Sequence, residues 1–122
     1  MKPKILIYED DESILEVLEM ILEEEGYEII ADTHCDNMAG IHQHMPDLIL
    51  IDLWIPELGG EEVCKEVKSD PKLKHIPVMF ISASNDTEKI AKRVHADAFI
   101  HKPFDISEVK EKAKKLLEKS SP

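Results

Sequence analysis

Residues 48–52 read Leu48-Ile49-Leu50-Ile51-Asp52, four apolar residues closed by an acid. An apolar run of this length, without the alternation of a half-buried strand, is typical of a parallel strand that helices cover on both faces. The acid marks the point where such a strand emerges into water. We therefore expect the fold to be built around this strand, with Asp52 at its carboxyl end.

Four other short apolar runs alternate with helix-like segments along the chain. They cover residues 5–7, 28–31, 78–81 and 98–100. This alternation predicts βαβ units and a mainly parallel sheet. Right-handed crossovers then give an α/β fold, a three-layer α/β/α sandwich with five parallel strands in the flavodoxin-like (βα)5 order 2-1-3-4-5. The runs 28–31 and 98–100 are the least apolar, so we place them at the edges of the sheet.

Five helices are expected between and after these strands. They cover roughly residues 12–25, 36–44, 60–68, 86–94 and 106–117. The second is the weakest prediction, because it is short and contains Gly40. In the last helix we expect Asp105 to be the N-cap and Ile106 to face inward with the later apolar residues.

Length and charge limit what the chain can be. With 122 residues it fits one domain, residues 1–122, and leaves no room for an effector domain. Lys and Arg number 15 against 26 Asp and Glu, which gives a net charge of −11 and disfavours direct binding to nucleic acid. We therefore expect its partners to be proteins.

The cysteines and the hydropathy bear on the cellular compartment. Cys35 and Cys64 are isolated, in neither a CxxC motif nor a metal-binding spacing, and we expect both to be reduced. The N-terminus enters a strand without the apolar segment of a signal peptide, and no apolar run is long enough to span a membrane. A cytoplasmic protein without membrane contact is the expectation.

Polar residues that can act together follow four of the five runs. Glu9 and Asp10 follow the first, Asp52 ends the third, Ser82 follows the fourth, and Lys102 follows the fifth. In a parallel sheet these ends share one edge, and ligands bind there near the switch point between the first and third strands. Carboxylates that converge repel one another unless a cation joins them, and Mg²⁺ is the cation that prefers oxygen ligands. One strand-end acid would mean little, but this set predicts a metal site.

The chemistry of the set is that of a phosphorylated carboxylate. Aspartate forms covalent phospho-intermediates, so Asp52 is the expected nucleophile. Mg²⁺ and Lys102 would neutralise the transferred phosphoryl group, and Ser82 would donate a hydrogen bond to it. The backbone carbonyl of Trp54, two residues past Asp52, is a further candidate metal ligand.

These residues give the whole chain a family resemblance. It resembles the receiver domain of two-component response regulators, in the manner of the chemotaxis regulators. The matching stretches are Ile5-Leu6-Ile7-Tyr8-Glu9-Asp10-Asp11-Glu12, Pro46-Asp47-Leu48-Ile49-Leu50-Ile51-Asp52-Leu53-Trp54-Ile55-Pro56 with Gly60, Pro77 to Ser82-Ala83, and Ala96-Asp97-Ala98-Phe99-Ile100-His101-Lys102-Pro103-Phe104.

The resemblance implies a role for each site residue. Asp52 would accept a phosphoryl group from a sensor histidine kinase or a histidine phosphotransfer protein, and Glu9 with Asp10 would be the metal-binding pair. Ser82 would be the switch hydroxyl, Lys102 the phosphate-binding lysine, and Phe99 the switch aromatic. Phosphorylation would change the surface of the fourth helix, fifth strand and fifth helix, where a downstream protein or a second copy would bind. Such a domain is a phosphoacceptor that assists its own phosphorylation and dephosphorylation, and is not an enzyme.

Some positions depart from the commonest family pattern. His95 stands where glycine is usual before the last strand, so we expect that turn to be tighter than usual or differently placed. Lys102-Pro103 matches a lysine-proline step that is often cis in the family. Trp54 and Ser84 lie two residues beyond Asp52 and Ser82, where relatives tune hydrolysis of the phosphoryl group, and we hypothesise that the indole of Trp54 shields the aspartyl phosphate from water.

Two other classes of function stay open at this stage. One is a protein-interaction module of receiver shape that works without phosphorylation. The other is a phosphatase with an aspartyl nucleophile, as in the haloacid dehalogenase class. That class has an Asp-x-Asp motif on its first strand, whereas here the residue two positions after Asp52 is Trp54. The sequence does not identify the kinase, the output partner, the oligomeric state or the lifetime of the phosphorylated form.

Overall fold

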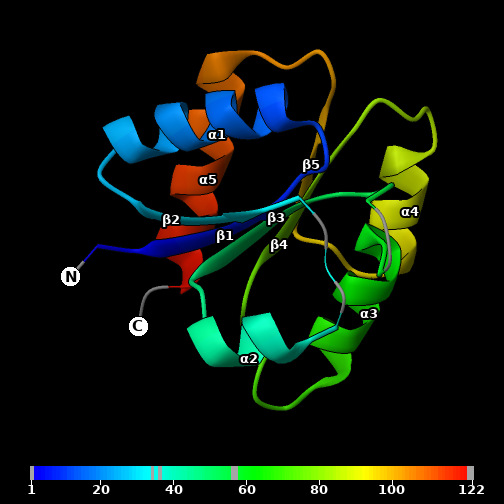
Figure 1. Ribbon diagram of the computed structural model, residues 1–122. Coiled ribbons are helices and arrows are strands. Elements are labelled where there is room, and N and C mark those ends of the chain that lie inside the picture. The colour runs from blue at the N-terminus through cyan, green and yellow to red at the C-terminus, as the bar shows by residue number, and fades with distance from the viewer. Residues whose placement is uncertain (1, 34, 36, 56–57, 121–122) are drawn as a thin grey trace.

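The protein is a five-stranded parallel sheet between two layers of helices, with strand order β2-β1-β3-β4-β5 (Figure 1). The computed structural model describes residues 2–33, 35, 37–55 and 58–120, so the expectations for Asp36, Pro56 and the last two residues lie outside the described part. The predicted fold class and strand order are confirmed. The strands are β1 (Lys4–Tyr8), β2 (Glu28–Asp32), β3 (Leu48–Asp52), β4 (Val78–Ser82) and β5 (Ala98–His101).

The helices divide unequally between the two faces of the sheet (Figure 1). α1 and α5 cover one face and α2, α3 and α4 cover the other, and each face has its own apolar cluster. The helices are α1 (Glu12–Glu24), α2 (Ala39–His44), α3 (Gly60–Ser69), α4 (Thr87–Arg93) and α5 (Ile106–Ser120). None of the described helices is both long and apolar enough to cross a membrane.

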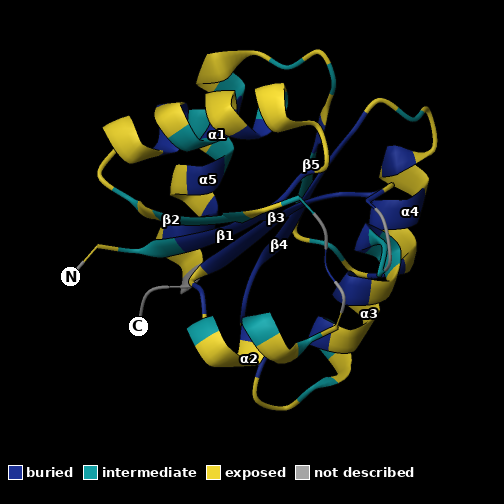
Figure 2. Ribbon diagram, in the orientation of Figure 1, coloured by how far each residue is buried: buried dark blue, intermediate teal, exposed yellow. Residues whose placement is uncertain are grey.

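Burial follows the hydropathy of the strands. Every residue of β3 and β4 is buried, whereas β2 and β5 are only partly buried (Figure 2). A strand with helices on both faces and a strand on either side has no surface left for water, which explains the uniform apolar run at 48–51. The prediction that 28–31 and 98–100 form the sheet edges is confirmed.

Local side-chain chemistry sets the start of α1. Asp11 is its N-cap, and its Oδ1 accepts hydrogen bonds from Ser13 N at 2.9 Å and Ile14 N at 3.2 Å. These bonds satisfy backbone donors that a helix N-terminus otherwise leaves unpaired. After the helix, Gly26 adopts φ 91°, a left-handed conformation that other residues rarely adopt.

Two local predictions are wrong. α2 begins at Ala39, later than the predicted start near residue 36, because Asn37 Oδ1 accepts a hydrogen bond from Ala39 N at 2.8 Å and forms a turn there. Ile106, expected to face inward, is 51% exposed. It is the first residue of α5, and the buried face of that helix begins one turn later at Val109.

The turn before β5 contains His95 at the position where the family usually has glycine. This residue adopts φ 61°, in the left-handed region that glycine occupies at lower cost. His95 thus adopts the backbone conformation that favours glycine, and whether the turn is tighter than usual or differently placed stays a prediction. The Lys102-Pro103 bond is cis, as the resemblance implied.

Candidate functional site

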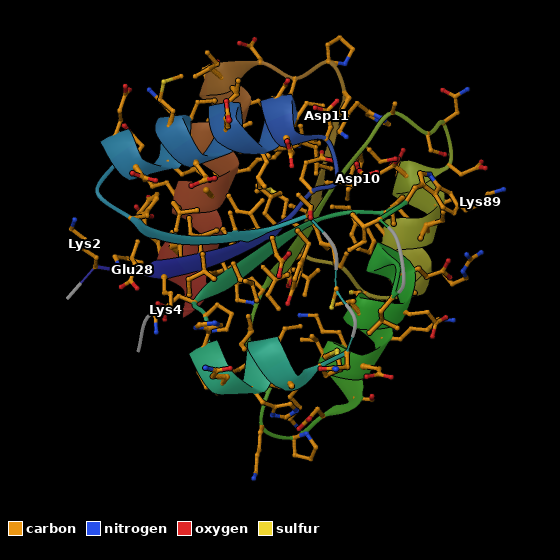
Figure 3. All side chains as sticks on the ribbon, viewed as in Figure 1. Lys2, Lys4, Asp10, Asp11, Glu28 and Lys89 are labelled. Carbon is orange, nitrogen blue, oxygen red and sulfur yellow. The ribbon has the colours of Figure 1, made fainter. Side chains whose placement is uncertain are left out.

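The predicted site residues meet at the carboxyl edge of the sheet. Glu9 and Asp10 follow β1, Asp52 ends β3, Ser82 ends β4, and Lys102 follows β5. β1 pairs with β3 and β3 with β4, so three of these strand ends are neighbours. Figure 3 shows Asp10 and Asp11 in the loop that leaves this edge for α1. The fold thus brings all five residues to one edge.

Three acids form the centre of the site. One carboxylate oxygen from each of Glu9, Asp10 and Asp52 lies within 4.8 Å of the others. Glu9 is fully buried and Asp52 is 6% exposed, whereas Asp10 faces solvent. Glu9 Oε1 accepts no hydrogen bond of ordinary geometry among the described residues. Convergent hard oxygen donors, one of them buried without a hydrogen bond, fit Mg²⁺.

Lys102 supplies the positive charge between two of these acids. Its Nζ lies 2.6 Å from Glu9 Oε1 and 2.5 Å from Asp52 Oδ2, and the first contact is an ion pair without hydrogen-bond geometry. Burial lowers the pKa of Lys102, but its contacts with Asp52 and Glu9 outweigh burial, and the net shift is upward. The ammonium group therefore stays charged inside the site.

Burial perturbs the carboxyl group of Glu9. Burial raises its pKa to about 7, and Lys102 opposes the shift without cancelling it. The second oxygen of the carboxylate, Oε2, accepts a hydrogen bond from Asp11 N at 3.1 Å. Near neutral pH this group is therefore poised between its two forms, which is expected for a carboxyl group buried away from water.

Backbone amides orient one side-chain oxygen of Asp52 and one of Ser82. Trp54 N donates a hydrogen bond to Asp52 Oδ1 at 2.8 Å, and Ser84 N donates one to Ser82 Oγ at 3.0 Å. Trp54 itself is 65% exposed, so its indole lies at the surface beside the strand end. The carboxylate and the hydroxyl are thus both oriented by amides two residues further along the chain.

Close packing of α3 fixes the end of β3 from behind. A Cβ on Gly60 would lie 2.8 Å from Asp52 O and 3.0 Å from Leu53 Cα. Both are backbone atoms, which cannot move aside as a flexible side chain can. Gly60 thus lets the helix start directly against the chain that carries Asp52.

Phe99 lies on β5 at the border of the core. It is half-buried and packs against the apolar cluster on the α3 and α4 face. Its ring meets that of His101 edge to face, with centroids 5.5 Å apart, and Lys112 Nζ lies 5.4 Å from the Phe99 centroid. Lys112 also donates a hydrogen bond to Phe99 O at 2.7 Å, so a lysine of α5 holds the edge strand.

Two contacts of this region were not predicted from the sequence, although the helix that carries Lys112 was expected to form part of the switch surface. Lys112 belongs to a run of lysines that resembles an ordinary solvated face, and Thr87 is a fully buried hydroxyl at the start of α4. Neither has a signal in the sequence, because each acts on a backbone carbonyl. Gly60 had one, since it belongs to the motif that carries the family resemblance.

Comparisons with known proteins agree on one family. A family model described as the response regulator receiver domain matches residues 5–114. The polar-differentiation response regulator DivK of Brucella anthropi is 34% identical over 121 residues, which cover 96% of this chain and 98% of DivK. The response regulator ArlR of Staphylococcus saprophyticus is 34% identical over 119 residues, and the chain spans about half of its length, 52%.

A solved structure of similar sequence has the same fold. The response regulator receiver domain protein (CheY-like) of Methanospirillum hungatei superposes with a TM-score of 0.88 at 27% identity. The superposition covers 98% of this chain and 97% of that one. The likeness therefore extends over the whole sheet and both helical layers.

Proposed function

The chain belongs to the response regulator receiver domain family, and on this premise we propose that it is a phosphoacceptor switch in which Asp52 takes a phosphoryl group from phosphohistidine. One observation carries the proposal: a buried aspartate ends the central strand with a lysine ammonium 2.5 Å from its Oδ2 and two further acids around it. We propose residues 1–122 as a single receiver unit of a two-component phosphorelay.

The transfer itself exchanges one bond for another. An Asp52 carboxylate oxygen attacks phosphorus, the P–O bond forms as the P–N bond to the imidazole breaks, and the leaving imidazole takes up a proton. Lys102, already beside Asp52, would then face the phosphoryl oxygens, and the Ser82 hydroxyl would donate a hydrogen bond to one of them. Trp54 N keeps Asp52 oriented through its hydrogen bond to Oδ1.

A metal ion completes the proposed site. Glu9, Asp10, Asp52 and the backbone carbonyl of Trp54 would hold Mg²⁺. When bound, the ion supplies positive charge that offsets the repulsion between the acids and the incoming phosphoryl oxygens. Among the described residues, Lys102 is the lysine that contacts both Glu9 and Asp52, and one ammonium group between two acids supports the need for a second cation.

The output of the switch would be a change in a protein-binding surface. We propose that Ser82 and Phe99 shift together on phosphorylation and alter the surface of α4, β5 and α5. Phe99 is suited to this because it is only half-buried on an edge strand. The proposed partners are a sensor histidine kinase or phosphotransfer protein upstream, and a downstream protein or a second copy of the chain. We propose the cytoplasm as the compartment, since Cys35 and Cys64 form neither a CxxC motif nor a disulfide-rich pattern in the sequence.

Mass spectrometry tests the function directly. Wild type and Asp52→Asn are incubated with Mg²⁺ and acetyl phosphate, and their intact masses are compared. A single phosphoryl adduct on wild type, absent from Asp52→Asn and abolished by a chelator, is the expected result. No adduct on folded, Mg²⁺-bound wild type, with acetyl phosphate or a kinase as donor, would favour the phosphorylation-independent module. Turnover of a generic phosphate ester would instead favour the phosphatase.

A further inference from the structure

One buried hydroxyl near the site has no part in the proposed transfer. The buried polar side chains of the described residues are Glu9, Asp52, Ser82 and Thr87, and the first three belong to the site. Thr87 is fully buried at the first position of α4. A hydroxyl is buried at a cost unless it makes a hydrogen bond, so the partner of this one indicates what it does.

The hydroxyl of Thr87 holds the loop between β4 and α4. Its Oγ1 donates a hydrogen bond to Ser84 O at 2.8 Å, a shorter contact than the 3.4 Å from Thr87 N to the same oxygen. Ser84 Oγ in turn accepts a hydrogen bond from Asp86 N at 3.1 Å, which closes the turn. The backbone of Ser84 is thus fixed from its carbonyl side by a buried side chain.

The backbone amide of Ser84 contacts the hydroxyl of Ser82. Ser84 N donates to Ser82 Oγ at 3.0 Å, and Ser82 is fully buried. In the part of the chain that the structure describes, Ser82 Oγ acts only as an acceptor. One lone pair of the oxygen is therefore engaged, and the O–H bond stays available for a phosphoryl oxygen.

We infer that Thr87 is a positioning residue for phosphoryl transfer, which acts through the backbone of Ser84 to orient the hydroxyl of Ser82. The inference rests on the proposed function, because it assigns the support of the Ser82 hydroxyl. Thr87 suits the role because its side chain is fully buried. Water therefore cannot replace its hydroxyl as the hydrogen-bond donor to Ser84 O. It also begins α4, so it ties the orientation of Ser82 to the position of that helix.

The test compares two substitutions at one position with a matched control. Thr87→Val keeps the shape of the side chain and removes the donor, and Thr87→Ser keeps the donor. The control is Ser69→Ala, which removes another hydroxyl that donates to a backbone carbonyl, Glu66 O at 3.2 Å, at the far end of α3. Urea unfolding confirms that each variant is folded before comparison.

Hydrogen exchange at the Ser84 amide measures the link without any phosphorylation. We expect this amide to exchange about tenfold faster in Thr87→Val and at the wild-type rate in Thr87→Ser and Ser69→Ala. Unchanged exchange in Thr87→Val would overturn the inference, because the hydroxyl would then not be holding the loop.

The rate of phosphorylation by acetyl phosphate measures the positioning role. Thr87→Val should lower the rate roughly fivefold, the usual worth of one hydrogen bond, and Thr87→Ser should restore it. In a Ser82→Ala background, Thr87→Val should cause no further loss, because the group that it positions is gone. An equal loss in both backgrounds would overturn the inference in favour of a general structural effect.

The two readouts also separate this inference from the function on which it rests. A wild-type protein that takes up no phosphoryl group overturns the proposed function, whatever the exchange results, and refutes a positioning role with it. A wild-type protein that is phosphorylated, and slowed by Ser82→Ala but not by Thr87→Val, overturns the inference alone.

Discussion

Replacing Lys102 by methionine should destabilise the protein, and the loss should be largest when no metal ion is bound at the site. The substitution keeps the length and much of the apolar stem of the side chain but removes the charge. Glu9 and Asp52 then remain buried without the ammonium group that lies 2.6 and 2.5 Å from them. Asp10 adds a third negative charge close by.

The size of the effect follows from this burial. Removing one partner of a buried ion pair costs about 3–5 kcal/mol, because a buried charge is left uncompensated. We expect about 3 kcal/mol at pH 8 in a chelator. The loss should be smaller at pH 6, since burial already raises the pKa of Glu9 to about 7, above its ordinary 4.5, and the folded variant can take up a proton there. Without Lys102 that pKa rises further, because the lysine lowers it.

Urea unfolding measures each of these quantities. Wild type and Lys102→Met are compared at pH 6 and pH 8, in chelator and in Mg²⁺. Mg²⁺ should stabilise the variant more than wild type, since the ion no longer shares its ligands with an ammonium group, and tenfold tighter binding would add about 1.4 kcal/mol at saturation. The control is Lys92→Met, whose side chain is 77% exposed and 3.5 Å from Glu88, and which should change stability by less than about 0.5 kcal/mol.

A loss of the same size at both pH values, or unaltered by Mg²⁺, would refute this reasoning. It would mean that Lys102 stabilises the fold by packing alone. An effect of the control as large as that of Lys102→Met would lead to the same conclusion.

Three further predictions test the surroundings of the site. Gly60→Ala should lower the free energy of unfolding by about 1–3 kcal/mol because the new Cβ would lie 2.8 Å from Asp52 O. A loss no greater than that of Gly40→Ala, whose Cβ would meet only the Tyr8 hydroxyl at 3.3 Å, would contradict the contact. Burial raises the pKa of the Cys64 thiol from 9.0 to about 11, so the folded state keeps this proton longer and stability should fall by up to about 3 kcal/mol between pH 9 and pH 11. Cys64→Ala should remove that part of the slope in chemical denaturation, and an unchanged slope would exclude the thiol as its source. Trp54→Asn should shorten the life of the phosphoryl adduct followed by mass spectrometry, and an unchanged or longer life would count against shielding by the indole.

The fold could be predicted from the sequence because its signals are local. Residues 48–51 and 78–81 are apolar throughout and prove buried throughout, and the less apolar runs lie at the edges. The start of α2 could not be predicted, because only Ile41 of that helix is buried and a turn at Asn37 decides where it begins. The exposure of Ile106 was missed for a related reason: helical periodicity gives the inward face of a helix but not the residue at which the core ends.

The site could be predicted in composition but not in its contacts. A residue that follows a parallel strand comes to a known edge of the sheet, so Glu9, Asp52 and Lys102 could be placed there from sequence. The contact of one ammonium group with two acids could not be predicted from the sequence. Lys102 follows β5 and Asp52 ends β3, and β4 lies between these strands. How far a side chain reaches across a strand depends on twist and packing, which leave no pattern in the sequence.

The crowding of acids at the proposed phosphorylation site is unfavourable for the fold when no ligand is bound. Glu9 is held in a place where burial raises its pKa, and a single lysine faces two acids. Any ligand that adds positive charge there lowers the free energy of the folded state, so metal binding and stability must be linked. The strands behind the site can tolerate this local cost because β3 and β4 are buried along their whole length. The stability of the folded state therefore depends on charge at the carboxyl ends of the strands, while the rest of the sheet is held by apolar packing. A phosphoryl switch requires this kind of local sensitivity to charge.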